Sequence, residues 1–259
     1  MKLIQSNDNP FFKELLKLTG SARQRGKANQ TLLDGAHLLA ASLDAGIFPL
    51  HILLNTEALQ DTEITALLER AGEVPITLLE NKLFTELSEL KTPTGVLTLI
   101  ALPQPNAAIT DSRFALLLED IQDPGNLGSI LRSAAAAGCD AVFLSPGCAD
   151  AWSPKVLRAA MGGHFALHIY ERQDLPDIAK KFHGTLLATS LQAKRSLYTC
   201  DLTDQVALMM GNEGAGLSDG LFKLATQKIT IPMLGNVESL NVAAATAICL
   251  FEVVRQRQQ

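Results

Sequence analysis

The sequence predicts an α/β protein with two domains, a small α/β domain near the N-terminus and a larger C-terminal domain built on a parallel sheet. First, apolar strand-like runs alternate with helical segments of about ten residues along most of the chain. Second, runs such as FALLL at 114–118 are apolar without interruption, which is typical of strands buried on both faces of a parallel sheet. Third, residues 101–113 contain prolines and show no periodicity, so we expect them to form a linker between the domains.

Residues 1–28 are expected to form a basic helical segment. Asn9 and Pro10 are typical of a helix start, and a polar connector follows the helix. The segment carries six basic and two acidic residues, a net charge of +4, whereas the whole chain has a net charge of −5. This excess of positive charge indicates either a solvated helix face or an arm that contacts RNA phosphates. The basic residues are Lys2, Lys13, Lys17, Arg23, Arg25 and Lys27.

The remaining elements follow from periodicity and from helix caps. The pattern of residues 29–100 predicts the small domain, in which a strand leads into a helix that ends at Gly46. Residues 114–259 predict the larger domain, in which strands and helices alternate up to a long apolar helix near the C-terminus. The predicted strands of the larger domain are FALLLED, AVFLSP, HFALHIY, TLLATS, VALMMGNE and KITIPM, and its predicted helices are NLGSILRSAAAAG, SPKVLRAAM, DLPDIAKKFHG and ESLNVAAATAICLFEVVRQR.

Composition excludes several classes of protein. Apolar residues make up 47% of the chain and charged residues 19%, as in an ordinary globular protein. No apolar run is long enough to span a bilayer, and the N-terminus does not resemble a signal peptide, so we expect a cytoplasmic protein without a membrane partner. The four cysteines form no CxxC pair and the histidines lack zinc-ligand spacing, so we expect reduced, mostly buried thiols and no metal.

Three loops that follow predicted strands carry polar residues that core packing does not explain. Ligands of parallel sheets bind at the carboxyl ends of the strands, so these loops are candidate parts of a binding site. The first loop carries Asn126, and Arg132 follows in the next helix. The second carries Glu213 among three glycines within 211–216, and glycines let a backbone approach a ligand closely. The third carries Ser239 and Asn241.

Each loop also has a plainer interpretation. Asp-Pro-Gly-Asn is common turn chemistry, a glycine-rich loop can be a flexible turn, and a lone helical arginine is usually solvated. Ser239 could simply cap the last helix. Asn241, in an otherwise apolar helix start, is harder to dismiss because a buried amide needs partners.

Together and in this order, the three loops resemble the three signature motifs of the SpoU (TrmH-like) family of RNA 2′-O-ribose methyltransferases, in the SPOUT superfamily. The resemblance spans residues 114–257, and residues 29–100 resemble more loosely the L30e-like substrate-binding domain of that family. It implies a parallel sheet with a deep trefoil knot, and a homodimer formed through the knotted domain. It also implies S-adenosyl-L-methionine as the cofactor, held by Thr189, Ser190, Leu191, Gly211, Asn212, Gly216, Ile231 and Leu240.

The resemblance also assigns roles to the polar residues. Arg132 would be the favoured catalytic group, either by steering the neighbouring phosphate or by accepting the proton of the ribose hydroxyl. We favour the first role because a guanidinium is effectively always protonated. The remaining residues would shape the site and orient the sugar and Arg132: they are Asn126, Glu213, Ser239 and Asn241. Glu238 is a departure, because a carboxylate stands where relatives commonly have small or neutral residues.

Two other functions compete with this one. The chain could be an RNA-binding factor of ribosome assembly without turnover, although such a protein would be expected to lose some of the motif residues. A nucleotide-dependent dehydrogenase is disfavoured because the first strand-turn lacks GxGxxG. For the substrate, we expect ribosomal RNA rather than transfer RNA, because the first domain resembles an RNA-binding ribosomal protein.

Overall fold

The structure is a computed structural model that describes residues 1–90, 92–105 and 109–258, and it divides into two compact units. The first unit comprises residues 1–103 and 152–165, and the second comprises residues 104–151 and 166–259. The sequence analysis assigns residues 152–165 to the C-terminal domain, whereas here they group with the first unit. The hydroxyl of Thr31 donates to the carbonyl of Trp152 (2.8 Å), which ties this segment to the N-terminal sheet.

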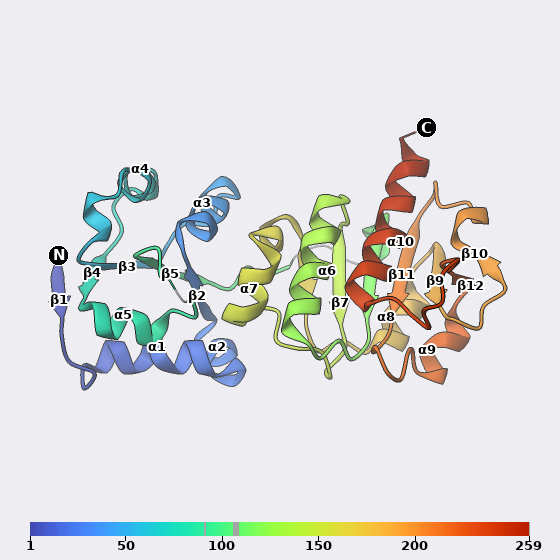
Figure 1. Cartoon of the computed structure of the whole chain (residues 1–259), viewed down its shortest axis with the longest axis horizontal. Helices are drawn as coiled ribbons and strands as arrows, with labels where there is room; N and C mark the ends of the chain where they lie inside the picture. The colour runs from blue at the N-terminus through green and yellow to red at the C-terminus, as the bar shows by residue number, and fades with distance from the viewer. Residues whose placement is uncertain (91, 106–108, 259) are drawn as a thin grey trace. The chain divides into compact units, whose positions relative to one another are not determined.

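Among the described residues of the first unit, five strands form a mixed sheet in the order β1-β4-β3-β5-β2 (Figure 1). Strand β1, which was not predicted from the sequence, pairs in parallel with β4. The elements are β1 (Lys2–Ile4), α1 (Pro10–Gly20), α2 (Ala22–Ala28), β2 (Gln30–Asp34), α3 (Ala36–Asp44), β3 (His51–Asn55), η1 (Ala58–Gln60), α4 (Thr62–Ala71), β4 (Ile76–Leu79), α5 (Asn81–Leu87), β5 (Val96–Ala101) and α7 (Pro154–Ala160), with η3 (Gly163–Ala166) at its end.

The second unit contains a parallel sheet whose described strands follow the order β10-β12-β9-β11-β6-β7-β8 (Figure 1). The predicted parallel sheet is therefore confirmed. The predicted trefoil knot stays a prediction. The elements are η2 (Ile109–Asp111), β6 (Phe114–Leu118), α6 (Pro124–Ala136), β7 (Ala141–Leu144), β8 (His168–Tyr170), α8 (Leu175–Lys181), β9 (Thr185–Thr189), β10 (Arg195–Ser196), η4 (Leu197–Thr199), β11 (Val206–Met210), α9 (Asp219–Leu224), β12 (Gln227–Thr230) and α10 (Val242–Arg257).

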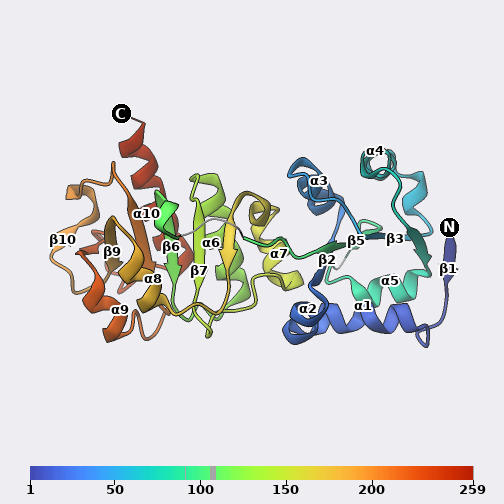
Figure 2. The same ribbon diagram turned by 180° about the vertical axis from the view of Figure 1, so that it is seen from behind.

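Helices cover both faces of this sheet. Alternate residues of β6, β7, β9 and β11 form a buried cluster with α8 and α9 on one face. Helices α6 and α10 pack against each other on the opposite face (Figures 1 and 2). Burial on both faces explains why β6, β7 and β11 are continuous apolar runs.

The four cysteines are free thiols, and three of them are buried, as the sequence analysis predicted. Burial raises the pKa of the Cys139 and Cys249 thiols to about 12. Both side chains therefore stay protonated near neutral pH and serve as small apolar core residues. In the described part of the chain, no helix is long and apolar enough to cross a membrane. Residues 106–108 of the predicted linker lie outside the described residues.

The expected polar connector after the first helix is wrong, because residues 22–28 form the second helix, α2. Ser21 caps this helix by accepting from the Gln24 amide at 3.4 Å. Arg25 is buried, with 4% of its surface exposed, and its guanidinium donates to the Leu18 carbonyl and to the Thr19 carbonyl (3.1 Å). These carbonyls lie at the end of α1, where a helix leaves its last acceptors without helical partners. Arg25 therefore has a structural role and does not belong to a solvated basic face or arm.

We expect Arg25→Ala to lower the free energy of unfolding by roughly 1.5–3 kcal/mol, because two buried carbonyls lose a charged donor. Arg23→Ala, at an exposed position of the same helix, is the matched control and should change it by less than about 0.5 kcal/mol. Urea unfolding followed by circular dichroism measures both. Equal stability of the two variants would contradict the structural role of Arg25.

Candidate functional site

The first two candidate loops lie side by side because their strands are neighbours. Strand β6 pairs in parallel with β11, with Leu118 opposite Met210. The loop to α6 and the glycine loop, residues 211–218, therefore leave the same edge of the sheet. Asp123 caps α6 by accepting from the Asn126 amide at 2.8 Å, which fixes the position of Asn126 at the start of the helix.

A chain of hydrogen bonds connects all three loops. The Asn126 side-chain amide donates to the Glu213 carboxylate, and the Asn241 side-chain amide donates to the Asn126 side-chain carbonyl at 2.9 Å. Both ends of the Asn126 amide are thus used, which determines its orientation. The sequence analysis brought these residues together only by resemblance, whereas the structure joins them through direct contacts across 87 and 115 residues of sequence.

Asn241 itself differs from what its apolar surroundings suggested. The side chain is exposed, not buried, and it caps α10 by accepting from the amides of Ala243 (2.9 Å) and Ala244 (3.3 Å). Helix α10 therefore starts at Val242, and the cap is Asn241 and not Ser239. Asn241 thus satisfies two free amides of the helix with its oxygen and uses its nitrogen to hold Asn126.

The glycine loop folds back on itself. Asn212 and Gly216 exchange backbone hydrogen bonds, at 3.1 and 2.8 Å, so that the loop closes over Gly211. A Cβ atom at Gly211 would lie 2.2 Å from the Gly216 carbonyl carbon, so no side chain fits there. Gly216 has a φ of 71°, in the left-handed region that glycine tolerates. Asn212 accepts from the amides of Gly214 (2.9 Å) and Ala215 (3.1 Å) and holds the turn.

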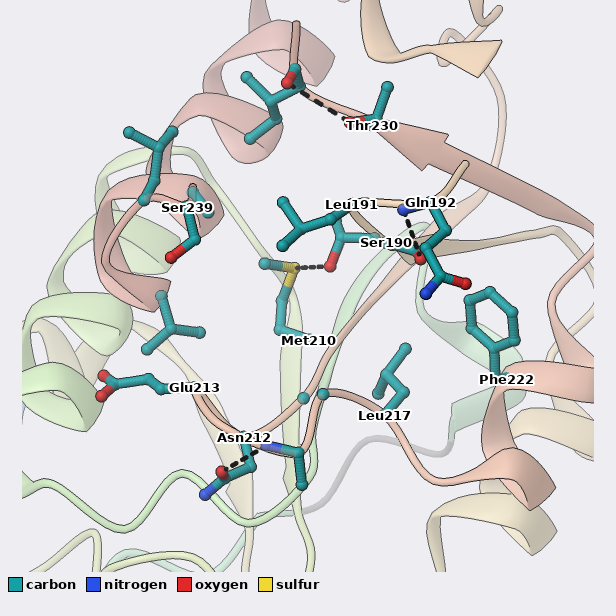
Figure 3. Close-up of a pocket in the computed structure, with 18 of the residues that line it drawn as sticks. Ser190, Leu191, Gln192, Met210, Asn212, Glu213, Leu217, Phe222, Thr230 and Ser239 are labelled. Atoms are coloured by element: carbon teal, nitrogen blue, oxygen red, sulfur yellow. Dashed lines mark hydrogen bonds between the residues drawn. The ribbon is translucent and has the colours of Figure 1, made fainter. Parts of the chain in front are cut away.

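Beside this loop lies a cavity of about 560 Å³, within the size range of small-molecule sites. Figure 3 shows Glu213 and Ser239 on one side of the cavity and Phe222 on the other. All eight residues predicted to hold a cofactor line it: Thr189, Ser190, Leu191, Gly211, Asn212, Gly216, Ile231 and Leu240. The glycine loop, the segment after β9 and the segment after β12 thus surround one space.

The structure does not bring every predicted residue to this cavity. Asn126 holds Glu213 from outside the lining, and Asn241 holds Asn126. Arg132 also lies outside the lining, exposed on α6 and about 9 Å further along the helix axis than Asn126. Arg132 makes no hydrogen bond or ion pair with the described residues, so its guanidinium is free to bind a ligand.

Sequence reasoning missed several residues of the lining, among them Gln192, Asp219 and Phe222. Asp219 and Phe222 belong to α9, a helix that the sequence analysis did not predict. A signal for it was present, because Ser218, the last residue of the glycine loop, and Asp219 are typical of a helix start.

The cavity suits a ligand with positive charge and a flat apolar part. Two carboxylates, those of Glu213 and Asp219, belong to the lining, and none of its described residues is lysine, arginine or histidine. Backbone groups of the glycine loop offer uncharged donors and acceptors, and apolar side chains such as Leu217 and Phe222 cover another wall. S-adenosylmethionine, a sulfonium that carries a purine, fits this set of groups. In the described part of the chain, no cluster of His, Cys, Asp or Glu could hold a metal ion.

Comparison with protein families gives two matches along the chain. Residues 113–251 match the SpoU rRNA Methylase family, and this match covers more than half of the chain. Residues 9–98 match the MRM3-like substrate binding domain.

Curated relatives match over nearly the whole chain. The chain is 36% identical to an uncharacterized tRNA/rRNA methyltransferase of Synechocystis, over 98% of this chain and 94% of that protein. It is 34% identical to the 23S rRNA (guanosine(2553)-2′-O)-methyltransferase of Bacillus subtilis, over 98% of this chain and 99% of that protein.

Solved structures also cover the whole chain. One described as an RNA 2′-O ribose methyltransferase has a TM-score of 0.84 at 30% identity and covers 99% of this chain and 100% of its own. The SpoU methyltransferase of Streptomyces viridochromogenes in complex with the cofactor AdoMet has a TM-score of 0.84 at 27% identity, and the match covers 96% of this chain and 99% of that one. The predicted fold class is therefore confirmed.

We expect Gly211→Ala to weaken the binding of S-adenosylmethionine by about tenfold or more, because the added methyl group would push the Gly216 backbone away. Gly220→Ala is the matched control, since its Cβ would meet only Ser218 Oγ, at 4.0 Å. Isothermal titration calorimetry measures both affinities. If Gly211→Ala bound the cofactor as tightly as Gly220→Ala, the tight closure of the loop would not matter for binding.

Proposed function

Because this chain belongs to the SpoU rRNA methylase family, we propose that it methylates the ribose 2′-hydroxyl of a nucleotide in ribosomal RNA, with S-adenosylmethionine as the methyl donor. The observation that carries the proposal is the hydrogen-bonded group of Asn126, Glu213 and Asn241 beside the cavity of the glycine loop. It supports a site in which a bound cofactor and an RNA sugar meet at one edge of the sheet.

The residues of the lining would bind the cofactor largely through shape and backbone groups. Gly211 and Gly216 would allow the close approach, and Leu191, Ile231 and Leu240 would contact the cofactor from elsewhere in the lining. When bound, S-adenosylmethionine supplies an activated methyl group on its sulfonium sulfur. The chain then has to hold the attacking ribose oxygen about 3 Å from that methyl carbon, in line with the bond that breaks.

We propose that Arg132 binds the phosphate next to the target ribose. Its guanidinium stays protonated, and its planar set of donors matches phosphate oxygens. Its exposure and its lack of partners among the described residues support this role. A positive charge near the 2′-oxygen would also stabilise the negative charge that develops as the hydroxyl loses its proton. Glu213 and Ser239 line the cavity and would orient the sugar, while Asn126 holds Glu213 and Asn241 holds Asn126.

Arg132→Ala is expected to lower kcat by about 100-fold or more while the affinity for S-adenosylmethionine stays close to that of the wild type, because Arg132 lies outside the cavity. Transfer of a tritiated methyl group to ribosomal RNA transcripts measures kcat, and calorimetry measures the affinity. Lys180→Ala, at an exposed position on α8, is the control and should keep wild-type turnover. An Arg132→Ala variant that methylates at the wild-type rate would remove Arg132 from the mechanism. Wild-type protein that binds both RNA and cofactor without transfer would support the non-catalytic alternative.

We also propose that the chain forms a homodimer through the face that contains α10. Phe251 on α10 is 47% exposed, and Leu234 and Val237 in the preceding loop are more exposed still. Large exposed apolar side chains on α10 and on the loop before it favour burial against a partner. Helix α6, which carries Arg132, packs beside α10, so this interface and the proposed phosphate contact share one face of the sheet.

Phe251→Glu is expected to convert the dimer to a monomer, because a charge would be buried in the interface. Phe48→Glu is the matched control, since Phe48 is 62% exposed in the first unit. Sedimentation velocity measures the oligomeric state. A wild-type monomer, or a Phe251→Glu variant that remains dimeric, would refute this interface.

A further inference from the structure

Two adjacent carboxylate residues follow strand β6, and the roles proposed above do not use them. Glu119 and Asp120 lie between the strand and the loop that leads to Asn126, and both are partly buried. Their hydrogen bonds reach the glycine loop from outside the cavity. These bonds hold the glycine loop at both of its ends.

Glu119 holds the far end of the loop. Its two carboxylate oxygens accept from the Ser218 backbone amide at 2.6 Å and from the Ser218 hydroxyl at 2.7 Å. Ser218 in turn caps α9, accepting from the Leu221 amide at 3.3 Å. One carboxylate thus fixes both the end of the glycine loop and the start of the helix that brings Asp219 and Phe222 to the cavity.

Asp120 holds the near end of the loop. Its backbone carbonyl accepts from the Asn212 side-chain amide at 2.9 Å. The side-chain oxygen of Asn212 in turn accepts from the backbone amides of Gly214 and Ala215 at the tip of the turn. Asp120 has a φ of 55°, a left-handed conformation that a non-glycine residue adopts at a cost in free energy. Ser145 holds it there, because its hydroxyl accepts from the Asp120 amide (2.9 Å) and donates to the Asp120 carboxylate (2.6 Å).

We propose that Glu119 and Asp120 are positioning residues that clamp the glycine loop at both ends, so that the loop has its binding shape before S-adenosylmethionine arrives. A loop rich in glycine has much conformational freedom, and fixing it in advance lowers the entropic cost of binding. The clamp rests on the proposed function, because the glycine loop forms part of the cofactor site of that function. It predicts an effect on cofactor affinity and none on turnover once the cofactor is saturating.

The test is a double-mutant cycle on cofactor binding. Glu119→Ala should weaken the binding of S-adenosylmethionine by about tenfold, because it removes both hydrogen bonds that hold Ser218. Ser218→Ala should weaken the binding by less, because the Ser218 backbone amide still donates to Glu119. In the double variant the two effects should not multiply, since both single variants remove the hydrogen bond from the Ser218 hydroxyl to Glu119. Glu119→Gln keeps one acceptor oxygen and should have an intermediate affinity. At saturating cofactor, kcat should stay at the wild-type value.

Hydrogen exchange separates ordering of the loop from a general loss of stability. In Glu119→Ala, the amides of residues 212–218 should exchange faster than in the wild type, and saturating S-adenosylmethionine should restore their protection. Asp61→Ala is the matched control, because Asp61 is a carboxylate that accepts from two amides at the start of α4 in the first unit. That variant should leave cofactor affinity and exchange in the loop unchanged.

Several results would overturn the clamp. They are wild-type affinity in both single variants, multiplicative effects in the double variant, and unchanged exchange in the loop. If the wild type binds S-adenosylmethionine and the variants bind it equally well, the clamp fails and the proposed function stands. If the wild type binds no S-adenosylmethionine, both fail.

Discussion

The site depends on the hydrogen-bonded group in which Asn241 holds Asn126 and Asn126 holds Glu213. Its members come from three segments that are far apart in the sequence, and only the parallel pairing of β6 with β11 brings the first two together. An amide used at both ends has one orientation, so each member constrains the next. The loops that approach the cavity are therefore not independent turns but parts of one polar assembly.

Beside this hydrogen-bonded group, the glycine loop presents backbone atoms to the cavity where another loop would present side chains. The glycine loop closes so tightly that Gly211 has no space for a Cβ atom, and the cavity beside it contains carboxylates but no basic residue among its described lining. Such a site suits a cofactor that carries its own positive charge. We propose that the positive charge that contacts RNA lies elsewhere, on Arg132. Such a separation would allow a chain with a net charge of −5 to act on a polyanion.

Much of the fold could be predicted from the sequence because its signals are local. Strands such as β6 and β11, buried on both faces, are uninterrupted apolar runs, and helix α7 begins at a Ser-Pro pair. What could not be predicted depends on contacts distant in sequence. Strand β1 exists through its pairing with β4, Arg25 is buried because α1 ends beside it, and Asn241 is an exposed cap although apolar residues surround it. The Glu119 and Asp120 contacts were likewise invisible, because their partners Ser218 and Asn212 lie more than ninety residues away.

The central claim is that this assembly directs a methyl group to a ribose hydroxyl of ribosomal RNA. Mass spectrometry of nucleosides from ribosomal and transfer RNA, in cells with and without this chain, tests it most directly. The account predicts that a 2′-O-methylated nucleoside is lost from one position in ribosomal RNA, and that it returns with the wild-type chain but not with Arg132→Ala. Unchanged ribose methylation in ribosomal RNA, or a loss confined to transfer RNA or to a methylated base, would contradict it.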